Sequence, residues 1–532
     1  MEITMIRINQ IKLPITHTKE NLTEKIYRQL HIAESDLLEV HIVKKSIDAR
    51  KKPELFYVYA VNVKVKEEAA LLKRNRDKNV MAVTERHYKI PHVKEGAVTE
   101  RPVIIGAGPA GLFCAYILTL SHLAPIVLER GKKVEERTED VLKYWETGIL
   151  DTASNVQFGE GGAGTFSDGK LNTLVKDPVG RNRFVLETFV KFGAPEKILY
   201  ENKPHIGTDI LSNVIAKMRE FMIQNGAEFH FETCVTDFDI QDGKICAVEC
   251  NHKTWMPCST CVLALGHSAR DTFRVLAERN FAMMAKAFAV GFRVEHPQEM
   301  VNRKQYGELY YDKLPAAPYK VTANLENHRG VYSFCMCPGG FVVNASSEEG
   351  RLAVNGMSYS KRDSKNANSA IIVSVTPDDF DGEDALSGVR FQEMLEERAY
   401  KLGGGKIPQQ LFGDYCEKKA SVSYGAFESQ TKGQATLCNL RGLLPEELEE
   451  SFIEGMHHFA HSIHGFDRAD AIVSGIESRT SSPVRITRDE RFEANIKGIY
   501  PCGEGAGYAG GIMSAAMDGL KVAEAIIERH GY

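Results

Sequence analysis

The stretch RPVIIGAGPAGLFCAYIL, residues 101–118, predicts a buried strand, then a glycine turn, then a helix. The apolar run at 103–105 is the strand, and the helix begins directly after the turn. Glycines in GxGxxG spacing allow a tight turn, a close approach of a pyrophosphate to the backbone, and close packing of the helix on the strand. The helix N-terminus adds free N–H groups and the positive end of a dipole. We therefore expect a dinucleotide site made here by Gly106, Gly108, Pro109, Ala110 and Gly111.

A second apolar strand, APIVLERG, supports this prediction because it ends in an acidic residue. Glu129 lies eighteen residues beyond Gly111, where its carboxylate can accept hydrogen bonds from a ribose. Arg130 follows directly, so the sequence predicts an adenine-ribose site at this strand end. A chance glycine turn is the alternative interpretation.

Length and composition indicate a globular protein of several domains. The chain has 532 residues, which suggests roughly three or four domains. A hydrophobic content of 43%, a charged content of 26% and a net charge of −5 give no reason to expect nucleic acid as a partner. No apolar run approaches the ~18 residues of a membrane helix, and the N-terminus lacks the apolar core of a signal peptide. We expect a cytoplasmic protein with a small-molecule substrate and no membrane partner, and the sequence does not indicate its oligomeric state.

Residues 1–96 predict a small α+β module with a strand, a helix at 19–31, strands at 38–45 and 54–65, and a helix at 67–75. The hairpin between the two later strands is basic and aromatic. It is either a surface for nucleic acid or, as we favour, a solvated charged turn before an alternating strand. Its residues are Lys44, Lys45, Arg50, Lys51, Lys52, Phe56, Tyr57 and Tyr59. HVKEGAVTERP, residues 92–102, is the predicted linker.

The dinucleotide-binding segment, residues 97–279, leaves its first sheet and returns to it. A helix near 208–225 precedes three short strands at 228–233, 233–241 and 243–250. They lead to the apolar run 262–265, which stops at Gly266. This order is typical of flavoproteins whose chain rejoins the first sheet. Residues 280–475 predict a mixed α/β region, which we expect to be the substrate domain.

The C-terminal segment, residues 476–532, contains the strand, glycine-rich turn and long helix of KGIYPCGEGAGYAGGIMSAAMDGL. We expect Gly503 and Glu504 to contact phosphate and ribityl groups. The helix N-terminus, at Gly510, Gly511 and Ile512, is expected near the carbonyl edge of a flavin ring. A reduced flavin becomes anionic, so a positive helix end there favours the reduced form.

The loop at 159–165 has too little side chain for an ordinary surface loop. Its backbone can lie against a flat ring and donate hydrogen bonds to it, and the residues that we expect to do so are Gly161, Gly162, Ala163, Gly164 and Thr165. The alternative is a flexible lid.

Several long motifs together resemble one known family. They are GAGPAG, LERG, QFGEGGAGTFSDGKL, KPHIGTD, ALGHSARDTF, FCMCPGG, ESRTSSPVRI and CGEGAGYAGG, in this order. The chain resembles the NAD(FAD)-utilising, or uncharacterised FAD-dependent, dehydrogenases over nearly its whole length. The resemblance implies non-covalent FAD and an α/β fold with a Rossmann-like, glutathione-reductase-like FAD domain. An α+β N-terminal module and a mixed α/β substrate domain complete the expected fold class. The resemblance implies no particular substrate.

Candidate catalytic residues are cations and proton donors, because flavin hydride chemistry needs a polarising group and often a proton donor. They are Lys170, His205, His267 and Arg479, with Arg270 considered beside them. Arg479 could hold an anionic substrate group in bidentate fashion. A structural salt bridge from Arg479 to Glu477 or Asp489 is the alternative.

Histidine and cysteine patterns give weaker signals. His457, His461 and His464 share a predicted helix face, but no carboxylate or cysteine completes a metal site nearby, so we expect no metal. Cys335 and Cys337 are expected to be ordinary buried thiols, with Cys502 near the flavin. No second GxGxxG follows a clear strand, so NADH or NADPH would bind transiently as an electron donor.

These observations together predict an FAD-dependent oxidoreductase that transfers a hydride between flavin N5 and a small organic substrate. Two alternatives remain open. One is an RNA-binding flavoprotein that uses the basic N-terminal hairpin. The other is a flavin-bearing redox sensor or scaffold.

Overall fold

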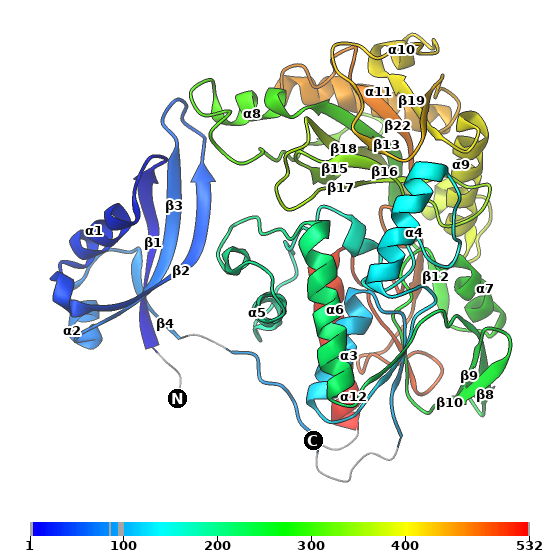
Figure 1. The fold of residues 1–532 in the computed structure, drawn as a ribbon, viewed down its shortest axis with the longest axis horizontal. Helices are drawn as coiled ribbons and strands as arrows, with labels where there is room; N and C mark the ends of the chain where they lie inside the picture. The colour runs from blue at the N-terminus through cyan, green and yellow to red at the C-terminus, as the bar shows by residue number, and fades with distance from the viewer. Residues whose placement is uncertain (1–3, 85–86, 94–99, 530–532) are drawn as a thin grey trace. The chain divides into compact units, whose positions relative to one another are not determined.

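A computed structural model describes residues 4–84, 87–93 and 100–529. The chain forms two compact units (Figure 1). The first unit contains the N-terminal residues to Lys89 together with Lys170–His205 and Asn302–Pro315. The second unit contains Ile90–Gly169, Ile206–Val301 and the chain from Ala316. Two chain segments distant from the N-terminus therefore fold with the N-terminal module.

The N-terminal part of the first unit is a four-stranded sheet with two helices. Its sheet order is β2-β3-β1-β4. Apolar residues of α1, including Ile26 and Leu30, pack on Ile6, Ile8 and Val61 of the sheet. The predicted order of elements is confirmed, with β4 as an additional strand. The elements are β1 (Thr4–Pro14), α1 (Lys19–Leu30), β2 (Leu37–Asp48), β3 (Phe56–Val65), α2 (Glu68–Arg74) and β4 (Val80–Thr84).

Within the hairpin between β2 and β3, part of the basic charge already has partners. Arg50 donates two hydrogen bonds of 2.7 Å to the carboxylate of Asp48, and the Lys45 ammonium lies 4.3 Å from the ring centre of Tyr57. The predicted linker at 92–102 includes residues 94–99, which lie outside the described residues. The first unit also contains α5 (Arg181–Lys191) and the 3-10 helix Glu196–Leu199.

A five-stranded parallel sheet of the second unit has the order β24-β11-β5-β6-β7. Because the strands are parallel, their carboxyl ends and the loops that follow lie at one edge. Its helices α3 and α12 pack on each other (Figure 1). The elements are β5 (Val103–Ile105), α3 (Pro109–Leu120), β6 (Ile126–Leu128), α4 (Val134–Thr147), α6 (Thr208–Gln224), β7 (Glu228–His230), β11 (Cys261–Leu263), α7 (Arg270–Glu278), β24 (Ile499–Pro501) and α12 (Ile512–Arg529).

Between β7 and β11 the chain forms an antiparallel meander in the order β10-β9-β8. Its strands are β8 (Val235–Gln241), β9 (Lys244–Cys250) and β10 (Thr254–Pro257). Of the three predicted strands, the one at 228–233 is β7, which instead joins the parallel sheet, and β10 was not predicted. The return strand β11 pairs with both β5 and β24, which places residues from three distant parts of the chain in one sheet. The second unit is thus a mixed α/β structure.

A seven-stranded sheet lies in the region expected to bind substrate, in the order β14-β15-β18-β13-β22-β19-β21. Helix α11 packs on it through Phe452, whose ring lies edge-on to Phe292 with centroids 5.0 Å apart. Its strands are β13 (Phe288–Pro297), β14 (Thr322–Asn324), β15 (Gly330–Cys337), β18 (Asn366–Val375), β19 (Ile407–Leu411), β21 (Ala435–Leu437) and β22 (Ile472–Glu477).

Smaller elements join the two sheets of the second unit. A two-stranded ribbon pairs β12 with β23, and a three-stranded sheet has the order β17-β16-β20. In the described ranges, no helix is both long and apolar enough for a membrane span. The remaining elements are α8 (Gln298–Tyr306), β12 (Met283–Ala285), β16 (Phe341–Asn344), β17 (Val354–Met357), α9 (Ser387–Gly403), α10 (Phe412–Cys416), β20 (Thr431–Lys432), α11 (Glu446–Ser462) and β23 (Val484–Ile486).

Candidate cofactor site

The glycine turn after β5 is closely packed at two positions and open at a third. A Cβ on Gly106 would lie 2.3 Å from the Ala264 carbonyl oxygen, and one on Gly111 would lie 1.9 Å from the Gly106 oxygen. By contrast, a Cβ on Gly108 would have Gly162 Cα, at 3.8 Å, as its nearest neighbour. Gly108 is also the N-cap of α3. The turn therefore leaves space at the helix N-terminus, where phosphate is favoured.

The loop at 159–165 lies directly against this turn. Gly161 donates its N–H to the Ala107 carbonyl at 2.8 Å. A Cβ on Gly162 would lie 3.1 Å from Gly108 Cα. A Cβ on Gly164 would lie 2.9 Å from Ile512 Cγ1, at the start of α12. The loop, the turn after β5 and the C-terminal helix thus meet at one place, as predicted from the glycine spacing.

Arg137 on α4 fixes the shape of this loop, and sequence analysis missed it. Its buried guanidinium lies 4.9 Å from the ring centre of Phe166. Burial lowers the pKa of Arg137 to about 10. The guanidinium donates hydrogen bonds of 2.7 to 3.3 Å to the carbonyl oxygens of Asn155, Val156, Gly159, Glu160 and Gly162. One cation therefore holds five backbone carbonyls in place, three of them in the loop and two just before it.

The side chain of Glu160 anchors the same loop to two helices. Its Oε2 accepts hydrogen bonds from the Val134 N–H at 2.9 Å and from Arg219 at 2.6 Å. Burial raises the pKa of Glu160 to about 7, although Arg219 opposes that shift. Val134 is the first residue of α4, so the carboxylate lies at a helix N-terminus. This carboxylate serves the fold. Gly161, Gly162 and Thr165 donate their N–H groups to the carbonyls of Ala107, Gly159 and Gly162, so three of the five predicted backbone donors of the loop are already used within the protein.

Glu129, the predicted ribose acceptor, binds the protein backbone. Its Oε2 accepts the Ala107 N–H at 2.8 Å, and its Oε1 accepts the N–H groups of Gly131 and Gly159 at 2.9 and 3.0 Å. A carboxylate has about four acceptor positions, so about one remains for a ribose hydroxyl. Its main contribution in this structure is to tie the β6 end to the turn and the loop.

A cavity of about 580 Å³ opens beside the β6 end. This volume is within the roughly 300–1,000 Å³ range of small-molecule sites. Arg130 lines it, with its guanidinium 4.4 Å from the ring centre of Phe158 and paired with Asp271 at 2.9 Å. Two buried lining atoms, Ser154 Oγ and Arg270 Nε, have no hydrogen-bond partner in the described structure. The cavity thus offers both an aromatic wall and unused polar groups to a ligand.

His267 and Glu504 face each other at the ends of β11 and β24. The distance from His267 Nδ1 to Glu504 Oε1 is 3.3 Å. His267 Nε2 is buried and has no hydrogen-bond partner within the described ranges. The two strand ends touch, since a Cβ on Gly505 would lie 2.3 Å from the Gly266 oxygen. His267 therefore has one ring nitrogen available to a ligand.

Gly266, Gly510 and Gly511 leave open space at the same edge of the sheet, because a Cβ on any of them would meet no atom within 4 Å. The turn at Gly503 is held by Asp518 of α12, which accepts the Gly503 N–H at 2.8 Å. Arg488 in turn binds the Asp518 carboxylate at 2.7 and 2.9 Å. Open glycines and a fixed turn therefore leave space at the α12 N-terminus.

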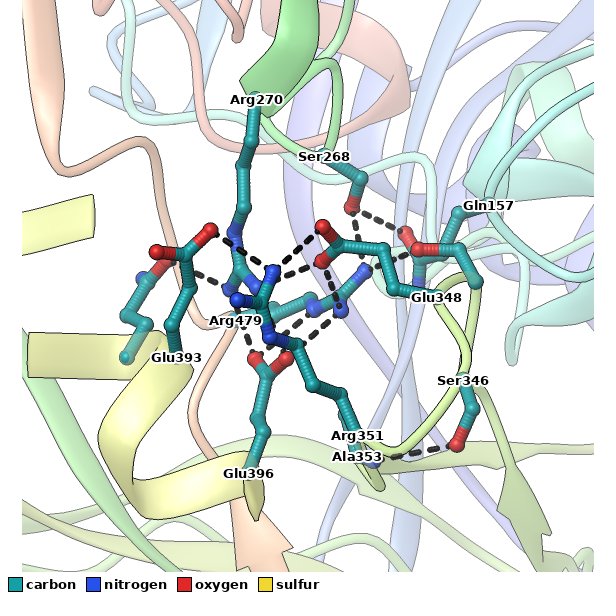
Figure 2. A network of polar contacts seen from close by, with 12 residues as sticks. Gln157, Ser268, Arg270, Ser346, Glu348, Arg351, Ala353, Glu393, Glu396 and Arg479 are labelled. Atoms are coloured by element: carbon teal, nitrogen blue, oxygen red, sulfur yellow. Dashed lines mark hydrogen bonds and ion pairs between the residues drawn. The ribbon is translucent and has the colours of Figure 1, made fainter. Parts of the chain in front are cut away.

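Arg479 lies in a buried ionic network instead of facing an open site (Figure 2). It donates two hydrogen bonds to Glu396, at 2.7 and 2.9 Å. The remaining N–H groups reach Ser268 at 3.1 Å, Ser347 at 2.6 Å and Glu348 at 3.4 Å. These bonds use all the donors of a guanidinium. The predicted salt-bridge partners Glu477 and Asp489 were wrong, since Glu477 pairs with Arg293 and Asp489 caps backbone N–H groups.

Arg270 completes this network. Figure 2 shows its guanidinium and that of Arg479 between the carboxylates of Glu348 and Glu396. Burial alone would raise the pKa of Glu396, but the two arginines hold it far below its usual range. Ser268, Arg270 and Glu348 also line the cavity of about 580 Å³. The network therefore forms part of the cavity wall and connects it to α9.

The four candidate catalytic residues are divided between the two units. Lys170 and His205 pair across an isolated antiparallel bridge in the first unit. His267, Arg479 and the glycine turns belong to the second unit. The structure thus brings His267 together with the predicted cofactor residues and gives Arg479 a different environment.

The histidine pattern at 457–464 does not form a single helix face. Helix α11 ends at Ser462, before His464. His457 Nδ1 pairs with Asp467 at 2.9 Å, and His461 Nδ1 contacts the His458 carbonyl at 3.1 Å. A search of the described residues finds no group of three or more side chains that could hold a metal ion.

The burial of the cysteines differs from the prediction at one position. Cys337 and Cys502 are buried, whereas Cys335 is exposed. Cys258 and Cys261 have CxxC spacing in the sequence. Hydrogen bonding to Cys258 and burial raise the pKa of Cys261 well above 9.0, so its reactive thiolate is disfavoured.

Comparisons with known proteins support FAD and give no support to NADH or NADPH. Residues 287–480 match the family described as FAD-dependent protein, C-terminal domain-like, and residues 5–64 match a domain of unknown function. A Clostridium beijerinckii protein named only as uncharacterized is 48% identical over 532 residues, which are 98% of this chain and 99% of that protein.

Three solved structures are similar to this chain at low sequence identity. The quinol fumarate reductase FrdA of E. coli has a TM-score of 0.37 and 11% identity, with 81% of this chain and 70% of that chain covered. Glycine oxidase of Bacillus cereus has a TM-score of 0.31 and 12% identity, with 82% of this chain and 96% of that chain covered. L-proline dehydrogenase of P. horikoshii has a TM-score of 0.35 and 14% identity, with 81% of this chain and 95% of that chain covered. At such scores these similarities carry no argument about the reaction.

Proposed function

The chain belongs to the same family as the Clostridium beijerinckii protein and contains an FAD-dependent protein C-terminal domain-like region, and on this basis we propose that it is an FAD-dependent oxidoreductase acting on a small organic substrate. The proposal includes non-covalent FAD in a glutathione-reductase-like arrangement. No comparison supports the RNA-binding or redox-sensor alternative.

One observation carries the proposal. In three distant segments of the chain, some glycines are so closely packed that a Cβ would clash, and others border open space that a ligand could fill. Gly108, Gly266 and Gly510 are open, whereas Gly106 and Gly111 are closely packed. A purely structural turn has no reason to keep open glycines at two helix N-termini. The orphaned Nε2 of His267 in the same region fits a polar ligand.

Different parts of the chain would hold different parts of FAD. The turn at Gly108 and the α3 N-terminus suit the pyrophosphate, and the cavity beside Arg130 suits the adenine nucleoside. The loop held by Arg137 and the α12 N-terminus suit the ring and its carbonyl edge. When bound, FAD supplies two-electron hydride chemistry.

The chain's own residues orient reactants and control protons. Arg137 and Glu129 hold the loop backbone in one conformation through their hydrogen bonds, so the loop needs little rearrangement on binding. His267 can donate or accept a proton at Nε2, and Glu504 faces its other ring nitrogen. Electrostatic preorganisation of this kind is the contribution we expect from the protein.

A paired glycine substitution tests the proposal. In Gly108→Ala the new Cβ fits the protein, because its nearest neighbour is at 3.8 Å, but it occupies the expected phosphate position. We expect a normal melting temperature and a FAD affinity reduced at least tenfold, measured by flavin fluorescence titration. The control is Gly330→Ala on β15, where the new Cβ would lie 3.6 Å from its nearest neighbour, Ser374 Oγ. This variant should bind FAD normally. Equal FAD affinity in both variants, or no flavin binding by the native protein, would contradict the proposal.

A further inference from the structure

We propose that Lys286 and Arg485 form a binding site for a small monoanionic carboxylate, and we infer that this is the acidic group of the substrate. The assignment of the carboxylate to a substrate rests on the proposed function. The binding site itself rests on the arrangement of these two side chains. Neither residue is among those predicted to bind the cofactor.

The strand pairing of β12 and β23 places the two cations on one face. Met284 lies opposite Arg485, and Ala285 lies opposite Val484. The Lys286 N–H continues the ladder by donating to the Pro483 carbonyl at 2.8 Å. Side chains two residues apart on a strand share a face, so Lys286 is a diagonal neighbour of Arg485, with Cβ atoms roughly 7–8 Å apart. An anion of a few atoms can contact both.

Neither cation has an ion-pair partner in the part of the chain that the structure describes. Arg485 donates from one terminal nitrogen to the Gly507 carbonyl at 3.1 Å, and its Nε is buried with no partner. Lys286 Nζ reaches the Ala287 carbonyl at 3.5 Å, a long contact. Burial, together with the nearby Arg485, lowers the pKa of Lys286. Two cations thus face each other with donors unused.

The charged groups around Lys286 and Arg485 carry a net charge of one positive unit. Glu504 is the carboxylate that acts on Lys286, but His267 lies 3.3 Å from the same carboxylate. Arg488, the next cation along, is already matched by Asp518. Two cations and one acidic residue therefore leave a surplus of one positive charge. This surplus matches a carboxylate, whereas a phosphate monoester carries nearly two negative charges at neutral pH.

The cation pair lies against the glycine turn that we expect to hold the cofactor. A Cβ on Gly507 would lie 2.8 Å from the Val484 oxygen and 3.1 Å from Arg485 Cα. The Ile486 N–H donates to the Ala506 carbonyl at 3.2 Å. The Arg485 guanidinium also lies 5.1 Å from the ring centre of Tyr508. A carboxylate bound here is held beside the turn at 503–511, and the planar guanidinium favours such a group.

Saturation-transfer difference NMR tests the site with acetate as the probe and acetamide as its neutral isostere. On the full chain, as purified and after FAD addition, we expect the acetate methyl signal to be strong and the acetamide signal to be at background. Lys286→Met and Arg485→Met should each lower the acetate signal at least fivefold. The matched controls Lys253→Met and Arg491→Met change exposed cations elsewhere and should leave the signal unchanged.

Three results would overturn the inference. They are equal signals from acetate and acetamide, an acetate signal that survives both substitutions, and displacement of acetate by a tenfold lower concentration of inorganic phosphate. Loss of FAD binding in Lys286→Met, measured by flavin fluorescence, would also overturn it, since the pair would then hold the cofactor. If the native protein binds acetate but no FAD, the carboxylate site stands and the proposed function fails.

Discussion

Arg479 and Arg485 are six residues apart in sequence and have opposite environments. Arg479 is buried, donates to two glutamates and two serines, and shares its counter-charges with Arg270. Arg485 has a buried Nε without a partner and a lysine as its charged neighbour. The first arginine is fully satisfied by the fold, and the second still has donors for a ligand.

This difference shows how to separate a structural arginine from a binding one. A buried charge is tolerated when its partners are complete, and removing one partner then leaves an expensive unpaired charge. A partly exposed charge without partners costs little in water and gains from an incoming anion. Substitutions at the two places should therefore differ in kind. Those in the network should affect the stability of the fold, and those at the cation pair should affect binding.

The largest expected effect is that of Glu396→Gln. It keeps the side-chain volume but leaves Arg270 and Arg479 buried without their shared carboxylate. We expect a loss of about 3–5 kcal/mol in the free energy of unfolding, measured by urea denaturation. The control Glu397→Gln removes a half-exposed carboxylate that pairs with Arg351 and should cost less than about 1 kcal/mol. Similar losses in both would show that burial does not distinguish the two ion pairs.

Arg137→Met is expected to have the next largest effect. The substitution leaves several buried carbonyls of the loop without donors, and each such group costs about 1–3 kcal/mol unless water replaces the arginine. We expect reduced stability together with weaker FAD binding, measured by denaturation and flavin fluorescence. Lys143→Met changes an exposed residue of the same helix and serves as the control. Normal FAD affinity in Arg137→Met would remove the guanidinium from its positioning role.

The fold around the expected cofactor site could be predicted because its signals in the sequence are local. The strand, turn and helix around Gly106 follow from an apolar run, glycine spacing and helix pattern within a few residues. The N-terminal module was predicted in the same way. Segments that meet only in the sheet, such as β11 and β24, were predicted because each ends in its own glycine motif.

The partners of charged residues could not be predicted from the sequence. Arg479 binds Glu396, which is 83 residues away, and passes over Glu477, only two positions distant. Strand β22 ends at Glu477, whose carboxylate is already paired with Arg293, and Arg479 lies beyond the strand, so proximity in sequence did not decide the pairing. Arg137 sits in a charged helix that predicts a solvated face, and its burial depends on a loop that folds over it. Only the three-dimensional packing determines such contacts.

Acid pH should weaken the buried network before it affects the cation pair. The folded-state pKa of Glu396 is lowered, so its stabilisation is complete above the unfolded value of about 4.3 and is lost as pH falls toward the folded value. The loss should approach about 1.4 kcal/mol per pH unit below that point. Urea denaturation between pH 5 and pH 3 measures it. The Glu396→Gln protein should lack this component of the slope, and an identical slope in both proteins would assign the acid sensitivity to other carboxylates.

The smallest expected effect on stability is that of Lys286→Met at the cation pair. This lysine has no ion pair within the described structure, and its removal relieves repulsion from Arg485, so we expect a change within about 0.5 kcal/mol. Adding acetate should then raise the unfolding free energy of the native protein but not that of the variant, because a ligand stabilises only the state that binds it. Thermal denaturation with acetate, and with sodium chloride at equal ionic strength, separates specific binding from screening. A loss as large as that in Glu396→Gln would show that Lys286 belongs to the fold, like Arg479, and not to a binding site.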